Sequence, residues 1–247
     1  MKKSLLELDP QADALLILQC PNLQQVREPT DQEISATNKT AGINSSQKQQ
    51  NDTMKPPKTQ DQMTSLQPYL QNGHPNQIEF RVSAKHLCLA SPVFRKMIQG
   101  GFQESKPNNE GLLEITASDW NAEAFLTVLD IIHSHHYSVS GNLRLDAIAQ
   151  VGVIVDYYDC REVVQIFFES WRPSITKWLK YSLWPFHENV LEDVGDFGHD
   201  ETIVLFIART FPYGPCFKGL TRSAILNTLG LIETCLPIPT QILDANN

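Results

Sequence analysis

The chain has 247 residues, and its 41% hydrophobic content is enough to build a packed core in one large or two small domains. A formal net charge of -8 argues against direct binding to nucleic acid, because a phosphate-binding surface needs clustered Lys and Arg. The five cysteines include no C-x-x-C pair, which favours free thiols in a reducing compartment over disulfides or a zinc site.

The first twenty residues predict a short strand and no targeting signal. The run DALLIL at residues 13–18 is apolar enough for a buried strand, and Asp9-Pro10 introduces it. Acidic residues interrupt any apolar signal-peptide core in this region. Near the other end of the chain, the apolar run Ile203–Ala208 is too short to cross a bilayer. We therefore expect an intracellular protein of the cytoplasm, the nucleus or both, without membrane contact.

Residues 21–77 predict a disordered insertion between two neighbouring strands of one sheet. They are rich in Gln, Asn, Thr, Ser, Lys and Pro, with Tyr69 as the only aromatic residue, so they cannot bury enough apolar surface to offset the entropy of ordering. Closure entropy grows only logarithmically with loop length, so the insertion costs about 2 kcal/mol more than a short hairpin. It is either a tolerated spacer or a tether for partners and phosphorylation.

The stretch Ile78–Ser105 combines a strand and two short helices in one continuous run. Apolar and charged residues alternate over residues 78–82, as in a strand with one buried face. After Ser83 the apolar residues recur at helical spacing, and Ser91-Pro92 supplies an N-cap followed by a proline at the first helical position. Gly100-Gly101 then ends the second helix.

The rest of the chain predicts one more strand followed by helices. The expected elements are a strand at 112–116, a helix from a cap at Ser118 or Asp119 to about His133, a helix bearing Leu145, Ile148, Gly152 and Val155, a helix that Asp156–Cys160 opens and that ends at Trp171, and helices at Ile203–Phe211 and Thr221–Leu231. From Pro237 we expect a frayed tail.

No motif in the sequence predicts catalysis, a cofactor or a metal site. His133, His135 and His136 are clustered, but adjacent side chains at a helix end diverge, so we expect them to serve capping and solubility at a solvated helix terminus. There is no G-x-S-x-G, P-loop or H-E-x-x-H motif. Cys88 is predicted to be a buried small residue rather than a reactive thiol. We therefore expect that the protein is not an enzyme.

Three motifs in the central stretch carry a resemblance to a known family. The order F-x-V, L-x-x-x-S-P-V-F-x-x-M and G-x-F-x-E-S resembles the BTB/POZ domain, particularly its filamentous-fungal form. A helix ending in I-I-H, a polar turn, a helix ending near D-x-Y-x-C and a helix ending in Trp follow in the same order. The resemblance implies an α/β (α+β) fold with a small sheet flanked by helices over residues 9–171, interrupted at about 21–77. A helical extension at 172–236 and a flexible tail at 237–247 would follow.

BTB/POZ domains are protein-protein interaction modules that usually self-associate. The resemblance thus implies a non-catalytic module that forms a homodimer, pairs with other BTB proteins or recruits partners. A second implied function is a substrate adaptor of a cullin-3 type ubiquitin ligase, and a third is a transcriptional co-regulator.

The resemblance also implies two sets of site residues. Asp13 matches an acidic residue of the dimer core, and its basic partner position falls on Ala84, next to Lys85, with Ser83 in place of the family's usual histidine. Asp13 would otherwise be a strand-entry cap. Phe102-Gln103-Glu104 matches the hydrophobic-x-acidic motif that cullin-binding members place after the Met-containing helix, here the helix of Met97. The alternative is that Phe102 covers its own helix end and Glu104 is solvated.

Overall fold

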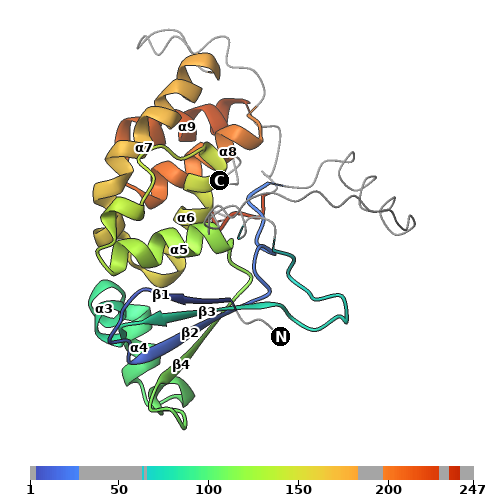
Figure 1. Cartoon of the computed structure of the whole chain (residues 1–247). Coiled ribbons are helices and arrows are strands. Elements are labelled where there is room, and N and C mark those ends of the chain that lie inside the picture. Colours follow the sequence, from blue (N-terminus) through green and yellow to red (C-terminus); the bar gives the residue numbers. More distant parts are fainter. Residues whose placement is uncertain (1–3, 28–62, 64–65, 183–196, 228–233, 240–247) are drawn as a thin grey trace, which may run out of the picture.

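The computed structural model describes residues 4–27, 63, 66–182, 197–227 and 234–239, which form a small sheet with helices on one face (Figure 1). The strands are β1 (Ser4–Glu7), β2 (Ala14–Gln19), β3 (Gln77–Val82) and β4 (Leu113–Ser118). The helices are α3 (Ala84–Ala90), α4 (Pro92–Gln99), α5 (Ala122–Ile132), α6 (Leu145–Tyr158), α7 (Arg161–Ser182), α8 (His199–Thr210) and α9 (Gly214–Asn227), with the short 3-10 turns η1 (Gln103–Ser105) and η2 (His136–Ser138). The fold is α/β, as predicted.

The sheet has the strand order β1-β3-β2-β4, with β2 antiparallel to β3 and the two outer strands parallel to their neighbours. Leu16, Phe80 and Ile115 are fully buried on the face that packs on the helices. There the ring of Phe80 meets Phe125 of α5 edge-on, with centroids 5.8 Å apart. β1 was not predicted, because four residues at a sheet edge are too few for a clear alternating pattern.

The capping residues of α3 and α4 lie where the sequence predicts them. The Ser83 side chain caps α3, and the hydroxyl of Ser91 accepts a hydrogen bond from the backbone N–H of Phe94 at 3.0 Å, with Pro92 at the first helical position of α4. α4 ends at Gly100, as predicted, and an added Cβ at this position would clash with the carbonyl oxygen of Lys96. The backbone at the end of this helix therefore fits glycine without strain.

The predicted insertion at 21–77 is packed on the domain at both of its ends. The Asn22 side chain accepts a hydrogen bond from Ala122 N–H at the start of α5 and donates to the carbonyls of Met63 and Leu66, at 2.8 to 3.0 Å. Residues 66–77 form a hairpin-like turn closed by a bridge between Tyr69 and Pro75. Residues 28–62 and 64–65 of the predicted insertion lie outside the described residues.

Two predicted helix starts are wrong. β4 continues through Ser118, and Asp119 has a left-handed backbone (φ 72°), so α5 is capped by Asn121 instead, whose side chain accepts from Ala124 N–H at 2.9 Å. Likewise the segment DYYDC does not open a helix but closes α6, because Asp159 adopts φ 50° as its left-handed C-cap. The family resemblance, which places the end of a helix near D-x-Y-x-C, is correct at this point.

The predicted boundary between domain and extension falls inside one continuous helix. α7 runs from Arg161 to Ser182 through the fully buried Trp171, with Pro173 in its interior. α8 packs on α6 where Gly152 leaves space for Phe206, and a Cβ on Gly152 would lie 3.1 Å from that ring. Phe168 and Phe211 stack at 4.7 Å. The extension therefore shares one hydrophobic core with the preceding domain.

The far end of the extension is partly described. The predicted tail begins at Pro237, yet Ile238 is 7% exposed and belongs to the shared core. Residues 183–196, 228–233 and 240–247 lie outside the described residues. None of the described helices combines the length and apolar character required to cross a bilayer.

Candidate interaction surface

The first predicted partner-binding residue, Phe102, stands on a short turn between α4 and η1. Its side chain is 53% exposed, although its ring also lies against Gly100, where a Cβ would come within 2.7 Å of the ring. The carbonyl of Phe102 accepts hydrogen bonds from the backbone N–H and the hydroxyl of Ser105, at 3.2 and 2.5 Å. These two hydrogen bonds close the turn, while about half of the Phe102 side chain faces solvent.

The two other predicted partner-binding residues lie next to this turn. Glu104 is in η1 and is half-buried, and Met97 is on the last turn of α4 and is also half-buried. We call the surface of Met97, Phe102 and Glu104 the α4–η1 surface. Its residues offer an aromatic side chain, a thioether and a carboxylate, which are chemical groups suited to contact another protein.

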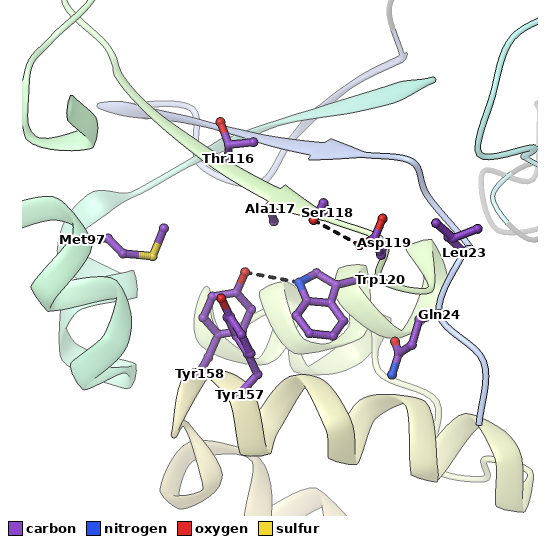
Figure 2. Close-up of a pocket in the computed structure, with 10 residues that line it drawn as sticks. All are labelled: Leu23, Gln24, Met97, Thr116, Ala117, Ser118, Asp119, Trp120, Tyr157 and Tyr158. Atoms are coloured by element: carbon purple, nitrogen blue, oxygen red, sulfur yellow. Dashed lines mark hydrogen bonds between the residues drawn. The ribbon is translucent and has the colours of Figure 1, made fainter. Parts of the chain in front are cut away.

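An open cleft of about 460 Å³ lies beside this surface, between β4 and the end of α6 (Figure 2). We call it the β4 cleft; its lining residues are Leu23, Gln24, Met97, Thr116, Ala117, Ser118, Asp119, Trp120, Tyr157 and Tyr158. The indole N–H of Trp120 donates to the hydroxyl of Tyr158 at 3.3 Å, and the ring of Tyr157 meets Trp120 edge-on at 5.1 Å. Burial raises the pKa of the Tyr158 hydroxyl, so it stays protonated.

The sequence did not predict this aromatic cleft. Trp120 and Tyr157 are 37 positions apart in the numbering of the chain, and no pattern in the sequence links these two positions. The only available signal was the pair of adjacent tyrosines, of which Tyr158 is buried and Tyr157 is 60% exposed.

The predicted dimer residues, Asp13 and Lys85, lie at the start of α3. An oxygen of the Asp13 carboxylate accepts a hydrogen bond from the Ala84 N–H at 2.7 Å, so Asp13 helps to cap this helix. The Lys85 side chain is exposed on α3, beside a hollow of about 410 Å³ that Leu89 also lines. The role of both residues in a dimer stays a prediction.

The histidine cluster differs from its prediction. His133 is buried rather than solvated: its Nδ1 lies 2.8 Å from the Leu129 carbonyl, and its Nε2 accepts from the Ser83 N–H at 3.0 Å. These contacts require a neutral ring with the proton on Nδ1, and burial lowers the pKa of His133. His135 instead contacts Asp130 at 3.2 Å. Within the described ranges, no three metal-binding side chains converge.

The cysteines are all free thiols. Burial raises the pKa of Cys88, and it raises those of Cys160 and Cys216 to about 12. A thiol with a raised pKa holds little thiolate near neutral pH, so these three positions do not suit nucleophilic chemistry. Cys88 is buried, as the sequence predicts.

A comparison with protein families agrees with the fold. Residues 70–172 match the family model of the BTB/POZ domain, a span that includes β3, the α4–η1 surface, β4, α5, α6 and the first half of α7. The small sheet with flanking helices is consistent with a BTB fold. A comparison with curated proteins found no match. The matched region indicates a protein-protein interaction module.

Proposed function

We propose that this chain is a non-catalytic module that recruits a cullin-3 type scaffold, or a partner of the same kind, through the α4–η1 surface. The observation that carries the proposal is Phe102, an aromatic side chain left 53% exposed on a turn that hydrogen bonds hold in place. The match to the BTB/POZ domain supports an interaction role. Cullin-binding members of that family are known for a hydrophobic-x-acidic motif in this loop, to which Phe102-Gln103-Glu104 is similar.

The chemistry of the α4–η1 surface suits such docking. A buried aromatic anchor at the centre of an interface commonly contributes 2 kcal/mol or more, on the order of a thirtyfold change in Kd. Because the turn is already ordered, little conformational entropy is lost when Phe102 is buried by a partner. Glu104 would accept hydrogen bonds at the rim, where it also sets the orientation of the partner.

Calorimetric titration of the purified chain with the cullin-3 N-terminal domain tests this proposal. We expect the double variant Phe102→Ala, Glu104→Ala to weaken binding by at least thirtyfold without a change in the melting temperature. The matched control is Tyr137→Ala, which removes an exposed aromatic residue from η2, and it should bind as the parent chain does. Unchanged binding by the double variant would remove this mechanism.

Self-association is the second candidate function, and a separate observation favours it. Leu89 on α3 is 69% exposed, next to Lys85 and the hollow that both residues line. An exposed leucine beside an apolar hollow is a suitable contact for a second copy of the chain. We expect Leu89→Asp to shift a dimer toward the monomer in analytical ultracentrifugation, and a parent chain that sediments only as a monomer would contradict this candidate. Either function would place the protein in the cytoplasm or the nucleus.

A further inference from the structure

One edge of the sheet is an open strand. β4 is last in the strand order, so only β2 is hydrogen-bonded along its length among the described residues. Open strand edges expose unpaired backbone N–H and C=O groups, and natural proteins usually protect such edges with charges, prolines or bulges. The last four residues of β4 read Ile-Thr-Ala-Ser at 115–118 and include no charge or proline, although Glu114 near the start of the strand is charged.

The register identifies which backbone groups face the open side. The N–H of Leu113 donates to the carbonyl of Asp13, the residue just before β2. The N–H of Asp119 donates to the carbonyl of Gln19, the last residue of β2. In a parallel pair of strands, alternate residues form the backbone hydrogen bonds to a given neighbour. The odd-numbered residues of β4 are therefore the ones that bond to β2. The even-numbered residues Thr116 and Ser118 therefore direct their N–H and C=O groups away from β2.

The open edge of β4 has a defined beginning and end. At the start of β4, Pro107 bridges Leu113, and the N–H of Asn108 donates to the carbonyl of Leu112. At the other end the strand stops at Ser118, because Asp119 has a left-handed backbone with φ 72°. About four residues of β4, 115–118, therefore have an open edge, and we call this stretch the window. At about 3.3 Å per residue, it has the length of a short strand.

The β4 cleft lies directly in front of this window. Thr116 and Ser118 line it, and both are exposed. Figure 2 shows Trp120 and the two tyrosines on the helix side of β4. Met97, which belongs to α4, lies at the end of the cleft away from Leu23 and Gln24. Asp119 is the one charged residue of the ten that line the cleft. Aromatic rings suit an apolar side chain, and the carboxylate suits a basic one.

We propose that β4 receives a short extended segment of a partner protein as an added strand. In this arrangement Thr116 and Ser118 exchange backbone hydrogen bonds with alternate residues of the segment. One apolar side chain of the segment occupies the aromatic part of the β4 cleft, and a Lys or Arg lies near Asp119. This docking mode shares Met97 with the α4–η1 surface but uses neither Phe102 nor Glu104, so it goes beyond the proposed cullin-type recruitment and can hold without it.

Peptide selection on the full chain tests this inference. Random heptapeptides displayed on phage are panned on the parent chain, and the enriched sequences are synthesised and measured by fluorescence anisotropy. We expect the enriched peptides to share an apolar residue near a Lys or Arg. Two versions of a selected peptide are then made, one N-methylated at its odd backbone amides and one at its even amides. One version should bind at least tenfold more weakly and the other less than twofold more weakly, because only one set of amides faces β4.

Variants of the chain provide the matching test. Ser118→Pro removes an N–H on the open edge of the window and leaves the bonds to β2 intact, so it should weaken peptide binding at least tenfold. Ser118→Ala keeps that N–H and should change binding less than twofold. The Phe102→Ala, Glu104→Ala variant should also retain peptide binding, which separates this inference from the cullin proposal.

Three results would overturn the inference. The first is the absence of any enriched peptide. The second is equal sensitivity to N-methylation in both registers. The third is full binding by a folded Ser118→Pro chain. Where thermal melting shows that this variant is unfolded, the N-methylated peptides on the parent chain decide the question alone.

Discussion

α8 and the α4–η1 surface are both rich in apolar residues, yet they end in opposite environments. Residues Thr202–Ala208 of α8 are all buried, with Phe206 fully enclosed between α6 and the rest of the extension. Phe102 is more than half exposed on a turn that Ser105 closes by hydrogen bonds. The difference teaches that an aromatic residue in this chain can be part of the core or part of a contact surface. Only its neighbours in space decide which role it has.

The largest expected effect comes from truncating the two phenylalanines in parallel. Phe206→Ala should lower the free energy of unfolding by about 4 kcal/mol, because it leaves a cavity where α8 packs on α6. Phe102→Ala should change it by less than about 0.5 kcal/mol. Urea denaturation followed by circular dichroism measures both. Similar losses for the two variants would mean that Phe102 belongs to the core rather than to a contact surface.

The next effect concerns Asn22, which attaches both ends of the insertion to α5. Asn22→Ala should cost about 2 kcal/mol, because it removes the acceptor for Ala122 N–H and the donors to two carbonyls. Asn22 has a left-handed backbone with φ 64°, so Asn22→Gly isolates the hydrogen bonds from backbone strain. If Asn22→Ala loses stability but Asn22→Gly is as stable as the parent chain, the loss comes from backbone strain. That result would show that the hydrogen bonds of the Asn22 side chain contribute nothing to stability.

On the buried side of the comparison, His133 should make stability depend on pH. Its pKa is lowered in the folded chain, so below the ordinary value of 6.5 the unfolded chain binds a proton that the folded chain does not. Stability should therefore fall by about 1 kcal/mol as the pH drops from about 6.5 to 5. His133→Gln should reduce this slope, whereas the same change at the exposed His74 should not. An unaltered slope in His133→Gln would assign the effect to other groups.

The smallest effect belongs to Arg27, which holds the start of the insertion on α6 and α8. Its guanidinium contacts Asp146 of α6 at 2.7 Å and Asp200 of α8 at 2.6 Å, and these interactions raise its pKa. Because the groups are partly exposed, Arg27→Ala should cost only about 0.5 kcal/mol, and less in high salt. The exposed Arg161→Ala serves as the control in thermal melts. A salt-independent loss would exclude ion pairing as the cause.

Local signals explain why some elements could be predicted from the sequence. Ser91-Pro92 and Gly100 act through their own backbone neighbours, so the start and the end of α4 were predicted correctly. The motifs around them were also enough to suggest the BTB/POZ domain, which the match to residues 70–172 supports. Short-range chemistry of this kind is visible in the order of residues alone.

Features that depend on distant neighbours could not be predicted. His133 is buried because Ser83, fifty positions away, supplies an N–H to its ring. The β4 cleft joins Trp120 to Tyr157, and the ends of the insertion are packed because Asn22 meets α5. In each case the partner lies on another element, and neither periodicity nor composition records such a pairing.

The measurement that tests the central claim most directly is light scattering coupled to size exclusion, on the purified chain with and without the cullin-3 N-terminal domain. An interaction module of the proposed kind predicts a shift to a complex of the summed mass, and the Phe102→Ala, Glu104→Ala variant should fail to make that shift. A parent chain that elutes unchanged in the presence of the cullin domain would contradict recruitment through the α4–η1 surface.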